Sequence, residues 1–282
     1  MKIIRQPGKM SVEMRKCRRA GKSIGLVPTM GALHEGHFSL IRKAREENDI
    51  VAVSIFVNPA QFGPGEDFKK YPRQSGKDTV YCRRMGVDFV FSPCAKDMYP
   101  EGYSTFVNVD GLSDALCGSS RPGHFRGVAT VLSKLFNIVL PDTVYMGQKD
   151  AQQAVIVSRM ARDLNFPLKV KVSPTVRGKD GLALSSRNTY LKEKDRASAA
   201  ALFKSLKLAE TMVKNGQRNS ARIIKSMKNL IEKNAAPRID YIKIVDRRNL
   251  KAVQKVKSGD LIALAVRFGR TRLIDNMIIK DA

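Results

Sequence analysis

The chain has 282 residues, of which 43% are hydrophobic and 7% aromatic, so it can build the core of one large or two ordinary globular domains. It has no apolar run of about 18 residues, so we expect no membrane partner. It also has no apolar leader after Met1, so we expect no secretion and favour a cytoplasmic location. The formal net charge is +25, and +15 of it falls in residues 177–282. The cations of this part are scattered around predicted helices, and no aromatic residues are interleaved with them. We therefore expect a solvated basic face and no specific nucleic-acid partner.

The first strand that we predict is a short apolar run at 24–27, which is followed by a turn and an amphipathic helix. Gly31 and Gly36 let the backbone of this turn approach a ligand. A helix N-terminus carries free N–H groups and about half a positive charge, so phosphates bind there readily. His34 and His37 are three residues apart and add donors on the same side of the helix. The segment therefore predicts a nucleotide site.

Two other interpretations of these histidines are a tight turn with exposed imidazoles and a metal site. A zinc-protease helix has the pattern His-Glu-x-x-His, whereas His34 and His37 are only three residues apart. Two of the three histidines of the chain fall in this turn, which favours a functional role over chance. The cysteines form no Cys-x-x-Cys pair, so we expect incidental thiols and no metal site: Cys17, Cys82, Cys94 and Cys117.

The next apolar run, at 50–57, does not alternate and is typical of a parallel strand buried on both faces. The loop at 58–65 is rich in Pro and Gly and contains Asn58 and Gln61. Loops after the carboxyl ends of parallel strands form ligand sites, although an amide in a loop is usually a turn residue.

A helix at 76–85 and a strand at 87–91 continue the alternation. Residues 92–123 form a long connection, with a short strand candidate at 105–109, of the kind that is often functional. A helix at 128–139 and a strand at 143–146 follow.

A second strand-to-helix turn lies at 147–150, before a helix that reaches about residue 164 and a strand at 168–172. Lys149 could neutralise a phosphate or a carboxylate. Asp150 could accept a hydrogen bond from a ribose hydroxyl, or could simply cap the helix.

The loop at 174–188 contains Ser185, Ser186 and Arg187, whose two hydroxyls and guanidinium suit triphosphate oxygens, although the same residues are also a plausible helix cap. Helices at 193–214 and 219–234 and strands at 239–245, 261–268 and 271–278 complete the chain. We therefore expect an α/β domain with a parallel sheet at 1–176 and a small α+β domain at 177–282.

Taken together, these segments resemble the pantothenate synthetase family, the AMP-forming pantoate–β-alanine ligases, which are relatives of the nucleotidylyltransferases. The resemblance covers nearly the whole chain and rests on VPTMGALHEGH at 27–37, IFVNPAQFG at 55–63, RPGHFRGV at 121–128, GQKD at 147–150, DGLALSSRN at 180–188 and RLIDN at 272–276.

The resemblance implies a Rossmann-like first domain, a C-terminal lid and a two-step reaction. ATP and pantoate would give pantoyl adenylate and pyrophosphate, and β-alanine would then release pantothenate and AMP. Mg²⁺ would arrive with the ATP phosphates rather than in a protein cage. The family is typically homodimeric.

Carried over residue by residue, the resemblance implies a proton donor at His37 and a water-mediated contact at Asp78. The residues implied to act in catalysis are His34, His37, Lys149 and Arg187. The residues implied to bind ATP are Met30, Gly31, Ala32, Leu33, His34, Glu35, Gly36, His37, Gly147, Gln148, Lys149, Asp150, Val176, Leu184, Ser185, Ser186 and Arg187. Gln61 is implied to contact pantoate and β-alanine, and Gln153 to contact pantoate.

Two competing functions remain at this stage. A different nucleotidylyltransferase would share the His-x-Gly-His turn, although the sequence around Gln61 and Gln153 argues against it. A nucleic-acid-binding protein is suggested by the basic C-terminal part, and salt-titrated binding would separate it from an enzyme with a basic surface.

Overall fold

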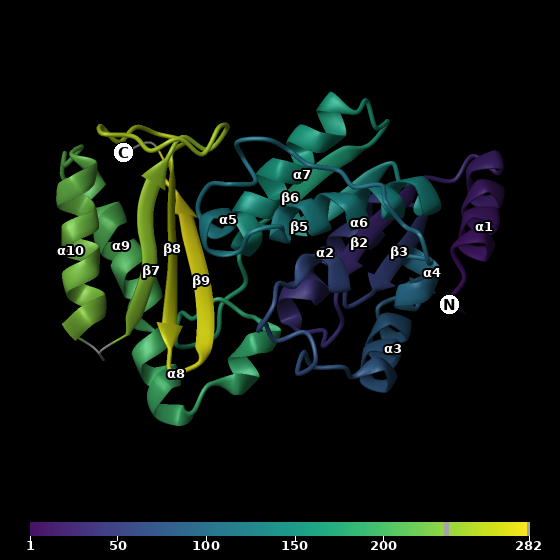
Figure 1. The fold of residues 1–282 in the computed structure, drawn as a ribbon, viewed down its shortest axis with the longest axis horizontal. Helices are drawn as coiled ribbons and strands as arrows, with labels where there is room; N and C mark the ends of the chain where they lie inside the picture. Colours follow the sequence, from purple (N-terminus) through teal and green to yellow (C-terminus); the bar gives the residue numbers. More distant parts are fainter. Residues whose placement is uncertain (234–236, 281–282) are drawn as a thin grey trace.

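Six parallel strands form the sheet on which the first part of the chain is built. The computed structural model describes residues 1–233 and 237–280 and is drawn in Figure 1. In space the strand order is β1-β4-β3-β2-β5-β6, with every neighbouring pair parallel. The strands are β1 (Lys2–Ile4), β2 (Ile24–Thr29), β3 (Ile50–Ile55), β4 (Phe89–Phe91), β5 (Thr143–Gly147) and β6 (Lys169–Ser173).

This order fixes where a ligand can bind. The chain moves from β2 outward through β3 to β4, and later resumes on the other side of β2 with β5 and β6. The crevice at the carboxyl ends of β2 and β5 is therefore the topological switch point, which is where open α/β sheets bind their ligands. Both turns that the sequence marked as anion sites follow these two strands. The Rossmann-like α/β class is confirmed.

Helices cover both faces of the parallel sheet and bury its inner strands β2, β3, β4 and β5, whereas the edge strands β1 and β6 stay partly exposed. One face packs on α1 (Pro7–Arg19), α6 (His124–Val139) and α7 (Ala151–Asp163) through a single apolar cluster. The other face packs on α2 (Glu35–Glu47) and α3 (Ser75–Arg84). Short segments between them are η1 (Pro59–Gln61), α4 (Ala95–Met98), α5 (Cys117–Ser120) and η2 (Gln148–Asp150).

The C-terminal part forms an antiparallel sheet of three strands with helices on its outer face (Figure 1). The chain enters it through η3 (Ser186–Tyr190). The remaining elements are α8 (Glu193–Ala199), α9 (Ala201–Lys214), α10 (Ser220–Lys233), β7 (Arg238–Val245), β8 (Leu261–Phe268) and β9 (Thr271–Ile278).

This small sheet is apolar on both faces, and each face has a different partner. Leu264 and Leu273 belong to the cluster that contains α9 and α10. Ala263 and Ile274 pack instead into the core of the parallel-sheet part. Since successive strand residues point to opposite faces, alternate positions of β8 and β9 hold the two parts of the chain together. The division at 176/177 into two domains stays a prediction.

The predicted elements are recovered with a few differences. The strand expected at 105–109 is wrong, because Val107 N donates to Thr130 Oγ1 at 2.9 Å and the Arg126 guanidinium lies 4.0 Å from the Phe106 ring centroid, so the segment is held by side chains of α6 rather than by a strand. The helix expected at 193–214 is broken between α8 and α9. Strand β1 and helix α1 were not predicted, and residue 234 of the last predicted helix lies outside the described residues.

Gly127 shows how closely α6 approaches the loop after β3. A Cβ at this position would lie 2.1 Å from the Ala60 carbonyl oxygen and 2.6 Å from the Gln61 nitrogen. The Asn58 side chain donates to the Gly127 carbonyl at 3.1 Å. Because backbone meets backbone, a larger residue cannot be accommodated by a side-chain rotation.

We expect Gly127→Ala to lower the free energy of unfolding by about 1–3 kcal/mol, since overpacking must displace α6 or η1. The matched control is Gly76→Ala in α3, where nothing lies within 4 Å of the added Cβ. This control should gain about 0.5–1 kcal/mol from helix propensity. Urea unfolding of both variants tests the prediction, and equal stabilities would contradict it.

Candidate active site

A large cavity opens at the switch point between the parallel sheet and the small sheet. Its volume is about 1450 Å³, which is large enough for a nucleotide and a second substrate. The predicted site residues that line it are Met30, His34, Gly36, His37, Gln61, Gly147, Lys149, Asp150, Gln153, Val176, Leu184, Ser185, Ser186 and Arg187. The predicted residues that do not line it are Gly31, Ala32, Leu33, Glu35 and Gln148.

The turn after β2 is held by a buried carboxylate. Asp78, in α3, is 1% exposed and accepts from the backbone nitrogens of Ala32 at 2.9 Å and Leu33 at 2.8 Å. Gly31 has φ +86°, and a Cβ there would lie 3.1 Å from Asp78 Oδ2. Since both carboxylate oxygens of Asp78 accept backbone hydrogen bonds, this residue shapes the turn, and the water-mediated ligand contact stays a prediction.

Two amides at the start of α2 are also occupied, which corrects the expectation of free N–H groups. The His34 nitrogen donates to His37 Nδ1 at 3.2 Å, and the Gly36 nitrogen donates to His34 Nδ1 at 3.2 Å. These contacts form a capping box made of histidines. The sequence could not reveal it because an imidazole is an unusual residue at both cap positions. The backbone nitrogens of His34 and Gly36 are therefore not free to bind an anion.

The capping bonds fix the tautomer of both imidazoles. Each Nδ1 accepts a backbone hydrogen bond, so the proton of the neutral ring is on Nε2 and can be donated to a ligand. The two ring centroids are 4.1 Å apart. Burial, followed by the Lys149 charge, lowers the pKa of His34 to about 4. Burial, followed by His34 and Lys149, lowers the pKa of His37 to about 3. Without a ligand, both rings are neutral donors at pH 7.

The turn after β5 brings a cation to the same cavity. Lys149 Nζ lies 3.3 Å from Asp150 Oδ1, and the lysine side chain is 20% exposed. The backbone carbonyls of Gln148 and Lys149 accept from Asn276 of the small sheet, each at 2.9 Å. Lys149 is therefore presented by a turn that both parts of the chain hold.

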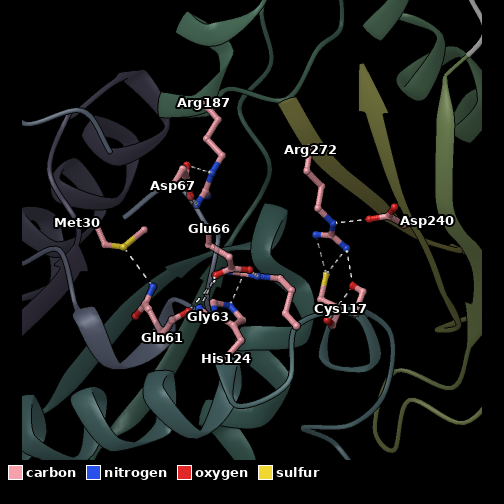
Figure 2. Close-up of polar contacts among 12 residues, drawn as sticks. Met30, Gln61, Gly63, Glu66, Asp67, Cys117, His124, Arg187, Asp240 and Arg272 are labelled. Atoms are coloured by element: carbon pink, nitrogen blue, oxygen red, sulfur yellow. Dashed lines mark hydrogen bonds and ion pairs between the residues drawn. The ribbon is translucent and has the colours of Figure 1, made fainter. Parts of the chain in front are cut away.

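Gln61 is oriented by neighbouring side chains, of which Figure 2 shows Met30. Its Oε1 accepts from Asn58 Nδ2 at 3.1 Å, and its Nε2 lies 3.2 Å from Met30 Sδ. Asn58 is 1% exposed and in turn accepts from Tyr99 at 2.7 Å. This arrangement holds the Gln61 amide at the cavity wall.

The third histidine supports the Gln61 backbone. His124 Nδ1 donates to the Gln61 carbonyl at 2.8 Å, so its Nε2 accepts from Arg121 at 2.9 Å. Arg121 also pairs with Glu66 at 2.6 Å (Figure 2). Burial, followed by the Arg121 charge, lowers the pKa of His124 to about 4. The sequence motif that contains Arg121 and His124 was recognised, but no role could be assigned to it.

The adjacent amides Gln152 and Gln153 have different environments. Gln152 is 6% exposed, accepts from the Cys117 nitrogen at 2.9 Å and donates to two carbonyls of the same loop, so it is structural. Gln153 is partly buried and lines the cavity. Gln152 lines the cavity as well, but its amide is already bonded to the loop, so Gln153 is the better placed of the two to contact a ligand.

The loop with Ser185 to Arg187 is docked on the loop before α3. Arg187 Nε and Nη2 lie 2.8 and 2.9 Å from the two carboxylate oxygens of Asp67 (Figure 2). The Tyr71 hydroxyl is 2.9 Å from Ser186 Oγ. Ser185 Oγ accepts from the Arg187 nitrogen at 3.3 Å, so the cap that the sequence left open is present alongside the exposure to the cavity.

Arg272 is paired with a carboxylate inside the small sheet and reaches across to the first part of the chain (Figure 2). Arg272 of β9 donates to Asp240 of β7 at 2.7 Å and to Ser120 of α5 at 3.3 Å. Its Nη atoms lie 3.6 Å from Cys117 Sγ. The cavity is therefore closed on this side by β9.

Among the described helices, none is long and apolar enough to cross a membrane.

Comparison with known proteins places this site in a family. The family model described as pantoate-beta-alanine ligase matches residues 2–278. A pantothenate synthetase of Moorella thermoacetica is 55% identical over 263 residues, which cover 93% of each chain. A pantothenate synthetase of Acetivibrio thermocellus is 50% identical over 282 residues, covering 99% of this chain and all of the relative.

Solved structures agree over the whole length. A pantothenate synthetase of Thermus thermophilus has a TM-score of 0.95 and 40% identity, with 100% of both chains covered. A pantoate-beta-alanine ligase of Francisella tularensis, described as complexed with beta-gamma ATP and beta-alanine, has a TM-score of 0.82 and 35% identity, covering 99% of this chain and 97% of the other.

The lowered pKa values predict that no histidine protonates near neutral pH in the ligand-free protein. In an NMR titration, the three histidine Cε1–H signals should not reach a midpoint above about pH 5, whereas in denaturing urea all three should titrate near their ordinary pKa of about 6.5. Because the unfolded chain then binds more protons than the folded one, stability should fall as the pH drops below about 6.5. A folded-state signal with its midpoint near 6.5 would contradict the prediction.

Proposed function

The chain belongs to the pantoate-beta-alanine ligase family and is a ligase, and we propose that it joins pantoate to β-alanine with consumption of ATP. In the first step a pantoate carboxylate oxygen attacks the α-phosphorus of ATP, and pyrophosphate leaves. In the second step the β-alanine amine attacks the acyl carbon of pantoyl adenylate, and AMP leaves. The observation that supports this most strongly is the cavity at the switch point, where His34, His37 and Lys149 line the same space as Gln61.

We assign ATP to the side of the cavity formed by the two strand-to-helix turns. His37 and Lys149 follow neighbouring strands, β2 and β5, and present an N–H donor and a cation to the same space. Negative charge builds on the pyrophosphate as it departs, so donors that are already in place stabilise the transition state more than the bound substrate. The lowered pKa of His37 should rise when phosphates bind beside it.

Arg187, Ser185 and Ser186 would complete the triphosphate site. The Arg187 guanidinium is now held by Asp67 at 2.8 and 2.9 Å. Phosphate oxygens would compete with this carboxylate for the same donors, so the loop can change partners as ATP enters. Closure of residues 177–190 over ATP stays a prediction, and it would keep water from the adenylate.

Mg²⁺ would enter as part of the ATP complex. Asp150 lines the cavity beside Lys149, whereas Glu66 is paired with Arg121 and Asp67 with Arg187. This donor set fits a cation held mainly by phosphate oxygens, as is usual for Mg²⁺. Bound there, the cation would neutralise phosphate charge.

Gln61 and Gln153 are assigned to pantoate, with Gln61 also near β-alanine. Gln61 is held by Asn58 on one side of its amide and lies beside Met30, so its side chain needs no reordering when a hydroxy acid binds. A prearranged amide lowers the entropic cost of orienting the substrate. The homodimer and the cytoplasmic location remain predictions.

The direct test is an assay with purified protein, ATP, Mg²⁺, pantoate and β-alanine, followed by mass spectrometry. We expect equimolar AMP and pantothenate, and pyrophosphate exchange into ATP that requires pantoate but not β-alanine. Omission of pantoate is the control and should abolish AMP formation. Failure to form pantothenate in the complete mixture would overturn the proposed function.

His37 should serve the first step and be nearly dispensable for the second. Replacing it with Asn keeps an acceptor near the position of Nδ1 but removes the Nε2 donor, whereas Gln keeps a donor near Nε2 and loses the capping bond to His34. Loss of one transition-state donor slows a reaction by about 10²–10³. His37→Asn should therefore lose ATP–pyrophosphate exchange by about this factor, and His37→Gln by less.

Supplying presynthesised pantoyl adenylate separates the two steps. With this intermediate and β-alanine, both variants should release pantothenate within about tenfold of the parent, a span of ~1.4 kcal/mol. If His37→Asn exchanges like the parent, the capping bond is what matters. The donor role would then have to be withdrawn.

A further inference from the structure

The carboxamide of Asn276 bridges the small sheet and the turn that carries Lys149. Its Nδ2 donates to the backbone carbonyls of Gln148 and Lys149, each at 2.9 Å, and its Oδ1 accepts from Gln148 Nε2 at 2.8 Å. The two carbonyl partners can only accept, so they fix which end of the amide is nitrogen. One side chain therefore makes three hydrogen bonds to two consecutive residues of the turn.

Asn276 is itself fixed by its surroundings. It is 5% exposed and pairs in register with Ala263 of β8, whose side chain packs into the core of the parallel-sheet part. Its own nitrogen donates to Asp275 Oδ1 at 2.8 Å, and Asp275 is held by Arg177 at 2.6 and 3.0 Å. Asn276 is also on the same face of β9 as Arg272, which reaches α5 (Figure 2). The side chain cannot move without the strand.

From this geometry, we propose that Asn276 is a positioning residue for Lys149 in adenylate formation. The inference rests on the role proposed above for Lys149. The turn is a single 3-10 turn between β5 and α7, so its own backbone bonds leave the direction of the Lys149 side chain poorly determined. Two carbonyls tied to a rigid strand remove that freedom.

The chemistry of the contact requires a carboxamide. The site needs two donors for the carbonyls and one acceptor for the Gln148 side chain, and a carboxylate of the same shape offers acceptors only. Asn276→Asp would place negative charge against two carbonyl oxygens without changing the packing volume. The isosteric variant therefore separates a hydrogen-bonding role from a space-filling one.

The test measures pantoate-dependent ATP–pyrophosphate exchange for Asn276→Ala and Asn276→Asp in the full-length protein. We expect kcat for exchange to fall at least about tenfold in both, with the KM for ATP changed by less than about threefold. Release of pantothenate from supplied pantoyl adenylate should stay within about threefold of the parent. Exchange by Asn276→Asp at the parental rate would overturn the proposal.

A double-mutant cycle with Lys149→Ala provides the sharper test. If Asn276 acts through Lys149, adding Asn276→Ala to Lys149→Ala should cost less than about threefold, whereas independent effects would multiply. Multiplication of the two losses would overturn the proposal.

The matched control is Met277→Ala, the next residue of β9, which packs into the cluster with α9 and α10 and has no part in the turn. It should lower the unfolding temperature while changing exchange equally in the parent and Lys149→Ala backgrounds. If Lys149→Ala leaves exchange intact, the role of Lys149 itself fails. If exchange is impaired in Lys149→Ala but not in the Asn276 variants, only the positioning role fails. The two failures can therefore be told apart.

Discussion

The buried carboxylate of Asp78 is the constraint on which the turn after β2, and with it one side of the cavity, depends. At 1% exposure it would be costly without partners, and it has them in the backbone nitrogens of Ala32 and Leu33 at 2.9 and 2.8 Å. These bonds hold a turn in which Ala32 has φ +51°, an uncommon conformation for a residue with a side chain. The hydrogen bonds to the Asp78 carboxylate of α3 offset this strain. The turn then holds His34 and His37 at the cavity in a fixed orientation.

The small sheet covers the cavity and also forms one of its fixed walls. Alternate residues of β8 and β9 pack on the parallel-sheet core, and Arg177 and Asp275 join the segment after β6 to β9 at 2.6 Å. A cover attached in this way cannot swing as one piece without exposing apolar surface. Motion during the reaction is therefore expected in the loop that carries Ser185 to Arg187, whose contacts to Asp67 and Tyr71 are polar and exchangeable.

Sequence patterns predicted the fold well because the strands have the apolar runs of buried parallel strands and the turns have glycine in the required places. The motifs predicted most of the site residues that line the cavity, with Gly31, Ala32, Leu33, Glu35 and Gln148 as exceptions, but not how the lining residues are held. Asp78, Asn58 and Asn276 act through partners that lie 46, 69 and 128 residues away in the chain, respectively, and no local pattern encodes such a partner. The strand expected at 105–109 failed for the same reason, since a side chain of α6 takes the place of a neighbouring strand.

The charge of the whole chain says little about the charge of the site. Although the net charge is +25, three cations that line the cavity each lie beside a carboxylate: Lys149 with Asp150, Arg121 with Glu66 and Arg187 with Asp67. A phosphate group that bound Lys149 or Arg187 would therefore meet a cation that is already paired. If Arg187 binds phosphate as we propose, phosphate oxygens must replace Asp67 there, and recognition would depend on a bidentate anion of the right geometry more than on long-range attraction. The excess of positive charge elsewhere on the surface can then steer anionic substrates toward the protein without deciding which of them reacts.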